Sequence, residues 1–283
     1  MIHFIYNPNA GIQNEAQKKQ WLAALQAIPN AVIWETNKPL EAIEFAKKAI
    51  AQKASKIIAI GGDGTVNEIG SVLTETTIPL GIIPMGSGNG LARHLQLPLQ
   101  FDAALTRALH GKEIAIDVGI INDRKFFCTT GIGFDAAVAS RFAKGRTRGF
   151  MNYVKSTLYT LFHYKPIEIS IDKGPLEKIF SLTIANANQF GNNAYISPYS
   201  DLQDAHLEVV TIQPHTILKA VTIAIRLFNK TIHASKKVSI RSIQHITVQY
   251  KKGMPIHIDG ESLETDIENL VISIEPQALF VIV

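Results

Sequence analysis

The segment at residues 57–68 constrains the fold of this chain more than any other. Three isoleucines at residues 57–60 predict a strand that is buried on both faces, as in a parallel sheet. Three glycines at residues 61–64 surround Asp63, and glycine lets backbone N–H groups approach a ligand closely because it has no Cβ. A helix that starts after this turn directs its free N–H groups toward an anion. The segment therefore predicts a site for nucleotide phosphates, and Asp63 adds a carboxylate suited to a divalent cation or a reacting hydroxyl.

Strands and helices alternate along the first part of the chain. Strands are predicted at residues 2–6, 31–34, 57–60 and 80–83, and helices at 15–28, from Pro39 to about 52, after Gly64 and at 91–95. This alternation predicts an α/β domain with a parallel, Rossmann-like sheet and helices on both faces. Ligands bind at the carboxyl ends of such strands, where the loops at Asn7, Gly61 and Gly86 fall.

The pattern changes after about residue 118, where short β-rich stretches begin. They lie at residues 166–171, 178–187, 206–213, 238–242, 245–250, 270–274 and 279–283, with helices predicted at 150–162 and 215–228. Such a pattern is typical of a mainly antiparallel β-sandwich. We therefore expect an α/β nucleotide-binding domain at residues 1–118 and a β-sandwich domain at residues 119–283.

Cysteine content and hydropathy indicate a compartment. The single cysteine, Cys128, excludes an internal disulfide, fits a reducing environment, and has apolar neighbours that predict a buried position. The N-terminus has neither a basic leader nor a full apolar signal region. No apolar run approaches the roughly 20 residues that span a bilayer. We expect a cytoplasmic protein.

The net charge of +4 is unevenly distributed along the chain. Residues 136–167 and 209–258 contain no Asp or Glu. Their cations include Arg141, Lys144, Arg146, Arg148, Lys155, Lys165, Lys219, Arg226, Lys230, Lys236, Lys237, Arg241, Lys251 and Lys252. This pattern fits either an ordinary solvated surface or peripheral association with an anionic membrane, to which each well-placed cation adds roughly 1 kcal/mol. No nucleic-acid motif is present, so we expect a membrane and no nucleic acid as partner.

Four motifs in fixed order resemble the signature of the diacylglycerol kinase catalytic domain, a superfamily that includes sphingosine and ceramide kinases. They are Asn7-Pro8 with Gly11, Gly61-Gly62-Asp63-Gly64-Thr65 followed by Asn67-Glu68, Pro84-Met85-Gly86-Ser87-Gly88-Asn89, and Asp259-Gly260-Glu261. The resemblance covers nearly the whole chain. It implies an ATP- and Mg²⁺-dependent kinase that phosphorylates a lipid hydroxyl, with diacylglycerol or a sphingoid base bound by the second domain. No P-loop motif of the form G-x-x-x-x-G-K-[ST] occurs.

The resemblance also implies the nucleotide contacts. They would be Asn7, Pro8, Asn9, Gly11, Thr36, Gly61, Gly62, Asp63, Gly64, Thr65, Asn67, Glu68, Gly86, Ser87, Gly88 and Asn89. Several of these positions have a structural alternative, because Asp63 and Glu68 can cap a helix and the loops at Asn7 and Gly86 can be plain turns. The basic residue common after Gly11 in the family is replaced by Ile12 and Gln13.

Three acids are expected at the reacting centre by the same resemblance. Asp63 would organise the metal or the acceptor hydroxyl, and either Asp259 or Glu261 would accept the proton of that hydroxyl. The sequence does not choose between the last two. Asp259-Gly260 is also a strong hairpin-turn signal in its own right.

A metal loop is implied at Asp201 and Asp204, which resemble the structural Mg²⁺ site of bacterial members. A backbone oxygen near His206 would complete it, since carboxylates and carbonyls are suitable Mg²⁺ ligands. Gln203 and Ala205 replace the acid and glycine that are usual within this loop, so a plain surface turn is the alternative.

Two other functions are compatible with parts of the sequence. One is an NAD-kinase-like enzyme that acts on a soluble nucleotide, and the other is a catalytically silent lipid-binding regulator. The Asn7 and Gly86 loops favour the lipid kinase over the first, and retention of Asp63 and Glu261 favours it over the second. The resemblance also implies that the chain can form a homodimer. Phe126, Phe127, Phe134, Phe142 and Phe150 are expected either to line an acyl-chain wall or to be ordinary core.

Overall fold

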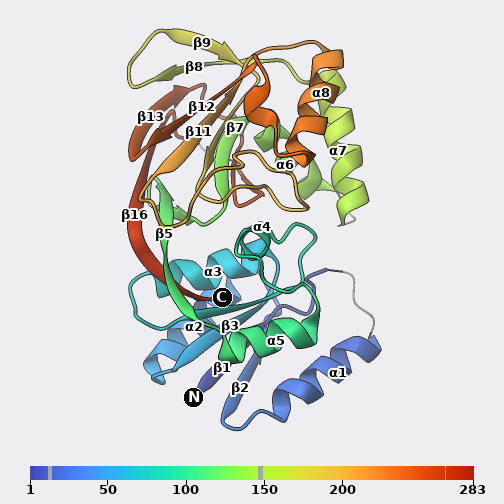
Figure 1. Cartoon of the computed structure of the whole chain (residues 1–283), viewed down its shortest axis with the longest axis vertical. Helices are drawn as coiled ribbons and strands as arrows, with labels where there is room; N and C mark the ends of the chain where they lie inside the picture. Colours follow the sequence, from blue (N-terminus) through green and yellow to red (C-terminus); the bar gives the residue numbers. More distant parts are fainter. Residues whose placement is uncertain (12–14, 146–148, 265) are drawn as a thin grey trace. The chain divides into compact units, whose positions relative to one another are not determined.

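The computed structural model describes the chain apart from residues 12–14, 146–148 and 265 (Figure 1). It divides into two compact units, which are described separately: unit 1 comprises Met1–Ile116 with Gln277–Val283, and unit 2 comprises Asp117–Pro276. Two strands, β5 (Glu113–Ile121) and β16 (Asn269–Ile282), run from one unit into the other. The C-terminal segment thus belongs to unit 1. The sequence analysis expected a single boundary between residues 118 and 119, with all later residues in the second domain. Ile12, Gln13, Arg146 and Arg148, used in the sequence interpretation, lie outside the described residues.

Unit 1 contains the predicted parallel α/β sheet. Its strands are β1 (Ile2–Tyr6), β2 (Ala31–Glu35), β3 (Lys56–Gly61) and β4 (Leu80–Pro84), in the parallel order β2-β1-β3-β4, and the end of β16 pairs parallel with β4. Its helices are α1 (Glu15–Gln26), α2 (Glu41–Ala51), α3 (Asp63–Leu73), α4 (Gly90–His94) and α5 (Phe101–His110). The isoleucines of β3 are fully buried, as the sequence predicts for a strand covered on both faces. Helix α5 was not predicted.

Two helix starts differ from the prediction for local reasons. Helix α2 begins at Glu41, because Leu40 has a left-handed backbone (φ 66°) and cannot belong to the helix. Pro39, expected in its first turn, therefore lies outside it. Helix α3 begins at Asp63, earlier than expected, with Gly62 in an extended conformation at the N-cap. Asp63 is therefore the first residue of the helix.

Unit 2 consists mainly of two antiparallel sheets. One has the order β12 (Val238–Ile243), β11 (Leu207–Ile212), β10 (Ser181–Ala185), β7 (Thr129–Gly133), β14 (Ile256–Ile258) and β15 (Glu261–Leu263). The other has the order β16, β13 (His245–Tyr250), β8 (Ile167–Ile171) and β9 (Leu176–Ile179), with β5 and β6 (Arg124–Phe126) alongside. The helices of this unit are α6 (Phe134–Lys144), α7 (Phe150–His163) and α8 (Ile217–Phe228), and a 3-10 turn lies at Ile232–Ala234.

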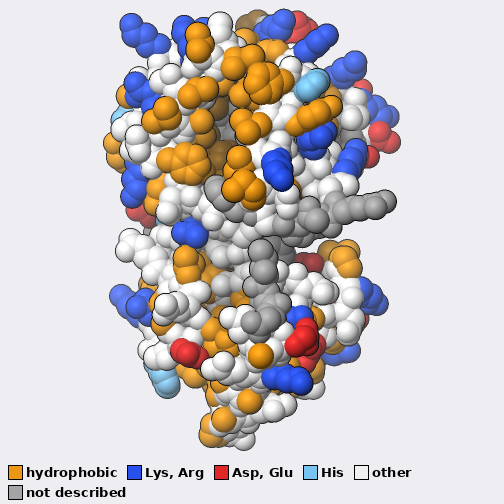
Figure 2. Space-filling model, turned by 90° about the vertical axis from the view of Figure 1, so that its right-hand side faces the viewer, with side chains coloured by type: hydrophobic (Ala, Val, Ile, Leu, Met, Phe, Trp, Pro, Cys, Tyr) orange, Lys and Arg blue, Asp and Glu red, His pale blue; other side chains and the backbone are white. Residues whose placement is uncertain are grey.

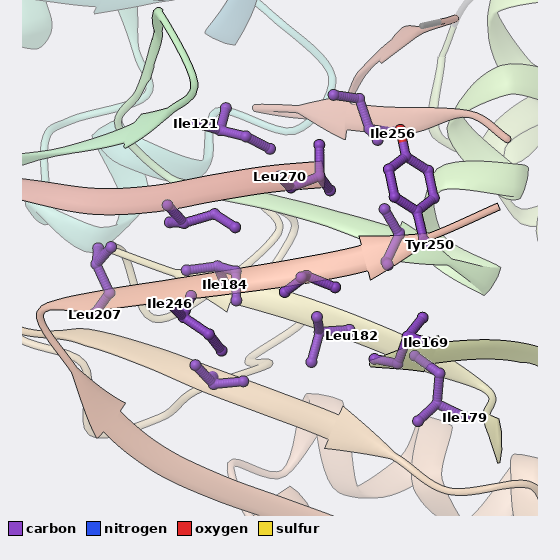
Figure 3. Close-up of a cluster of buried hydrophobic side chains, with 14 of the residues drawn as sticks. Ile121, Ile169, Ile179, Leu182, Ile184, Leu207, Ile246, Tyr250, Ile256 and Leu270 are labelled. Atoms are coloured by element: carbon purple, nitrogen blue, oxygen red, sulfur yellow. The ribbon is translucent and has the colours of Figure 1, made fainter. Parts of the chain in front are cut away.

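The core of unit 2 lies between these two sheets (Figure 3). Leu182, Ile184 and Leu207 from one sheet pack in the same cluster as Ile246 and Leu270 from the other. Apolar residues alternate along both inner faces, which is the arrangement that defines a β-sandwich. The predicted two-part fold class is confirmed.

Two smaller expectations concern burial and membrane spans. Cys128 is buried, as predicted from its apolar neighbours. Within the described part of the chain, no helix combines the length and the apolar character needed to cross a bilayer.

Candidate active site

Three loops meet at the carboxyl ends of the parallel strands of unit 1. Asn7 follows β1, Gly61 ends β3 and Met85 follows β4. The strand ladders extend into these loops, because the Asn7 N–H donates to the Ile60 carbonyl (2.9 Å) and the Met85 N–H to the Gly61 carbonyl (2.7 Å). The strand order β1-β3-β4 therefore brings together segments that lie far apart in the sequence, as the parallel pattern predicts.

The side chain of Asn7 connects the first loop to helix α3. Its Nδ2 donates to Thr65 Oγ1 (3.2 Å), and its Oδ1 accepts from the Asn9 N–H (3.0 Å). Thr65 is buried in the first turns of α3. Asn7 thus closes its own turn and holds that turn against the start of α3.

The glycines of the second and third loops are in van der Waals contact. A Cβ on Gly86 would lie 2.7 Å from the Gly62 Cα, and a Cβ on Gly62 would lie 3.1 Å from the Gly86 Cα. The first loop approaches equally closely, since a Cβ on Gly11 (φ +70°) would lie 2.1 Å from the Met85 carbonyl oxygen. No larger residue fits at Gly11 or Gly86 without movement of the backbone. The glycines are thus required by loop packing itself, before any ligand is considered.

Helix α3 presents its N-terminus at this junction. Its first backbone hydrogen bond runs from the Val66 N–H to the Gly62 carbonyl (3.0 Å), so the N–H groups at the helix start precede the helical ladder. Such N–H groups, together with the positive end of the helix dipole, bind anions. Asp63, as the first residue of α3, brings a carboxylate to the same place.

The Gly86–Asn89 loop is held in shape by its own side chains. Asn89 is buried, and its amide closes the loop by accepting from the Gly86 N–H (2.8 Å) and donating to the Gly86 carbonyl (2.8 Å). Arg93 Nε donates to the Gly88 carbonyl (3.0 Å). Both side chains therefore act on the loop backbone, and any nucleotide contact by Asn89 would be additional to this role.

Glu68 points toward a neighbouring helix. Its Oε1 accepts from the Leu40 N–H (3.1 Å), which lies at the N-cap of α2. Burial raises the pKa of the Glu68 carboxyl, and hydrogen bonds from the N–H groups of Leu40 and Ala42 oppose that shift. Glu68 thus caps α2, whereas the sequence offered only its own helix or the nucleotide. Thr36, at the end of β2, is buried and donates its N–H to the Tyr6 carbonyl (2.9 Å).

In unit 2, Asp259 and Gly260 form the predicted hairpin turn. They connect β14 to β15, with Ile258 paired to Glu261, and both have positive φ (47° and 82°) as a two-residue turn of this kind requires. The Asp259 side chain is buried and accepts three backbone N–H groups. These come from Phe127 (3.0 Å), Cys128 (2.7 Å) and Thr129 (3.1 Å).

The two acids of this turn therefore differ in environment. The Asp259 carboxylate fixes the segment that enters β7, whereas Glu261 is exposed. A general base needs an oxygen within reach of the proton that it accepts. This arrangement favours Glu261 over Asp259 for that role, and the assignment remains a proposal.

One cluster in unit 2, in which the partly buried Asp135 lies beside the buried Thr183 and His257, was missed by the sequence analysis. Asp135 Oδ2 accepts from Thr183 Oγ1 (2.6 Å) and lies 3.3 Å from His257 Nε2. Burial, and secondarily the charge of Asp135, raises the pKa of the nearby Tyr164 hydroxyl. A sequence signal was present, since residues 131–135 repeat the order of a strand, a glycine turn, an acid and a helix start seen at residues 57–68.

The loop at Asp201 and Asp204 forms two short side-chain turns. Asp201 Oδ1 accepts from the Gln203 N–H (3.0 Å), and Asp204 Oδ1 accepts from the His206 N–H (2.9 Å). Among the residues that the structure describes, no three or more His, Cys, Asp or Glu side chains are grouped to hold a metal ion. A Mg²⁺ site made of two carboxylates and a backbone oxygen near His206 is a different arrangement, and it stays a prediction.

Of the two alternatives for the phenylalanines, ordinary core applies to Phe126 and Phe127, and the acyl-chain wall is wrong for these two. Phe126 and Phe127 are fully buried, and Phe126 belongs to the sandwich core. Phe134 packs on Phe180 with ring centroids 4.6 Å apart. Burial in the core is the more frequent fate of large apolar side chains. The side chain of Phe150 is outside the described part.

Comparison with protein families gives two matches that together span most of the chain. Residues 1–121 match the diacylglycerol kinase catalytic domain. Residues 128–283 match the YegS C-terminal domain, described as NAD kinase β-sandwich-like. The two matched segments correspond to the two folds described above.

Several similar proteins have names that describe a lipid kinase. A probable lipid kinase YegS-like from Pectobacterium atrosepticum is 26% identical over 244 residues, covering 82% of this chain and 79% of the relative. A diacylglycerol kinase from Mycobacterium tuberculosis is 30% identical over 224 residues, covering 75% and 72%. The crystal structure of a putative diacylglycerol kinase from Bacillus anthracis superposes with a TM-score of 0.78 at 21% identity, covering 99% of this chain and 94% of that one.

Proposed function

Because this chain belongs to the family of diacylglycerol-kinase-like and YegS-like lipid kinases, we propose that it transfers the γ-phosphoryl group of ATP to a lipid hydroxyl. Diacylglycerol and sphingoid-type bases are the acceptor classes that we expect. The observation that carries the proposal is the junction of three backbone loops at the N-terminus of α3, beside Asp63. Amide groups and one carboxylate at a helix start suit phosphates with a cation.

The ATP phosphates would bind at this junction in unit 1. The contact between Gly62 and Gly86 leaves the loop backbones without side chains at that point, so N–H groups can approach phosphate oxygens closely. Asn7 and Thr65 would hold the first loop and the helix start in fixed geometry. Rigid donors aimed at developing charge account for much of the rate enhancement in phosphoryl transfer.

Mg²⁺ fits the donor set through Asp63. Mg²⁺ prefers carboxylate, phosphate and water oxygens, and Asp63 places one carboxylate where the phosphates are expected. When bound, the ion would neutralise charge on the phosphates. The second proposed Mg²⁺ position, at Asp201 and Asp204 with a backbone oxygen near His206, would be structural.

Unit 2 would bind the lipid and supply the base. We assign proton acceptance to Glu261, because it is exposed while Asp259 is occupied by three backbone amides. Asp135, partly buried beside Thr183 and His257, would accept a hydrogen bond from a hydroxyl of the acceptor headgroup.

The proposal is tested by phosphoryl transfer from radiolabelled ATP with Mg²⁺ to acceptors in anionic mixed micelles. The panel contains diacylglycerol, monoacylglycerol, sphingosine, ceramide and phosphatidylglycerol, with soluble NAD as a separate acceptor. The control is Asp63→Asn, which keeps the volume of the side chain and removes its charge. A labelled lipid that is absent with Asp63→Asn supports the lipid kinase.

Two outcomes would contradict it. Label on NAD alone would assign the chain to nucleotide phosphorylation. ATP binding without transfer to any acceptor would favour a catalytically silent lipid-binding regulator.

A further inference from the structure

Two helices of unit 2 expose large apolar side chains along one stripe each. On α7, Met151, Leu158 and Phe162 are exposed, and their spacing of seven and four residues places them on one side of the helix. On α8, Leu218, Val221, Ile225 and Phe228 are exposed at spacings of three, four and three. Phe162 is 65% and Leu218 is 82% exposed. Exposed apolar residues are ordinary when single, but a gathered set marks an interaction surface.

The opposite sides of both helices pack on one core cluster. Leu161 of α7 and Ile223 and Leu227 of α8 contact the cluster that contains Phe180 and Val210. The two helices therefore lie side by side on the sandwich, as Figure 1 also shows. Their outer stripes form one surface, which we call the α7/α8 face. Figure 2 shows apolar side chains gathered on this side of unit 2, with Lys and Arg around them.

The cations of the α7/α8 face stand beside its apolar residues. Lys155 lies on α7 and Lys219 on α8, and both are exposed. Arg141 of α6 lies over the Tyr159 ring of α7, with its guanidinium carbon 3.4 Å from the ring centroid. Neither helix contains an acid, nor do the surrounding segments 136–167 and 209–258. The face is therefore apolar and positive at once.

We propose that the α7/α8 face docks on an anionic lipid bilayer, with both helices lying in the plane of its interface. The choice of a bilayer as occupant rests on the proposed lipid kinase function. Apolar stripes flanked by Lys and Arg are the composition of helices that insert shallowly at an anionic membrane surface. A second copy of the chain fits less well, because a two-fold interface would bring the same cations together without opposing acids.

The test measures sedimentation of the full chain with vesicles, without ATP. One vesicle is an equimolar mixture of phosphatidylglycerol and phosphatidylcholine, and the other is phosphatidylcholine alone. The apolar variant is Phe162→Ser with Leu218→Ser, and the matched control is Leu176→Ser, which removes a 73% exposed leucine from β9 of the same unit. The charge variants are Lys155→Gln and Lys219→Gln.

We expect the wild type to bind the anionic vesicles and to lose binding at high salt. The apolar double variant should bind at least tenfold more weakly, and each charge variant about fivefold more weakly, while Leu176→Ser binds as the wild type does. Absence of wild-type binding, or unchanged binding by the apolar variant, would overturn the proposal. A concentration-dependent dimer in sedimentation equilibrium that the apolar variant abolishes would assign the face to self-association and also overturn it.

Docking and catalysis can fail separately in these experiments. Transfer to a water-soluble short-chain diacylglycerol without vesicle binding would refute docking and leave the kinase intact. Vesicle binding that depends on the α7/α8 face, with no transfer to any acceptor, would refute the kinase and leave docking intact.

Discussion

Replacement of Asp259 separates a structural acid from a catalytic one. In Asp259→Asn, Oδ1 remains to accept from the Cys128 and Thr129 N–H groups, while the Phe127 N–H loses its shorter bond to Oδ2 (3.0 Å) and keeps only the longer contact to Oδ1 (3.3 Å). The variant loses the charge assistance of the remaining bonds, weakens the bond of one buried donor and brings an amide NH₂ against that donor. Those losses add to about 2–4 kcal/mol of unfolding free energy. Glu261→Gln, at an exposed position of the same turn, should change it by less than about 1 kcal/mol.

Urea unfolding measures this difference by two signals. Both tryptophans, Trp21 and Trp34, lie in unit 1, so their fluorescence follows unit 1, whereas far-ultraviolet circular dichroism also follows the strands of unit 2. We expect Asp259→Asn to shift the dichroism transition more than the fluorescence transition. Glu261→Gln should leave both unchanged while lowering kcat by about 10²–10⁴.

Two results would refute this assignment. If Asp259→Asn kept its stability within about 1 kcal/mol and still abolished phosphoryl transfer, Asp259 would be the base and its three amide contacts would be incidental. If Glu261→Gln kept full kcat, Glu261 would have no part in proton transfer.

Three further changes have defined outcomes. Gly86→Ala should weaken ATP binding at least tenfold in calorimetry, because its Cβ would push apart the loops at Gly62 and Gly86 that are proposed to bind phosphate. Gly145→Ala, the control, should leave ATP affinity unchanged. Burial, and secondarily the N-terminal charge, lowers the pKa of His3. The contribution of His3 to the free energy of unfolding is therefore present above pH 6.5 and is lost as the pH falls below it. His3→Phe should remove this loss of stability, measured by Trp34 fluorescence in urea between pH 8 and 5. Burial raises the pKa of Glu68, so its contribution to the free energy of unfolding is present below pH 4.5 and is lost as the pH rises. Glu68→Gln should therefore gain stability relative to the wild type as the pH rises from 4 to 7. A difference in unfolding free energy that stayed constant over this range would contradict the prediction.

Local sequence patterns determined the elements of the fold. The isoleucine run of β3 and the Asp259-Gly260 hairpin were predicted correctly, whereas the glycine turn after β3 is shorter than predicted because α3 already begins at Asp63. In each case the signal and its consequence lie within a few residues, because side-chain periodicity and the φ angles that glycine permits act locally. The same reasoning failed at the start of α2, where Pro39 resembles a first helical turn but Leu40 adopts a left-handed backbone.

Only the tertiary structure decided which groups these elements bring together. Asp259 accepts N–H groups some 130 residues away in the sequence, Glu68 caps a helix 28 residues upstream, and Asp135 lies beside His257, 122 residues away. The amphipathic pattern of a segment specifies which side is buried but not which distant segment covers it. For this chain the sequence determined the glycine-rich loops and the two folds, whereas strand order and packing decided which backbone N–H groups the carboxylates of Glu68 and Asp259 accept.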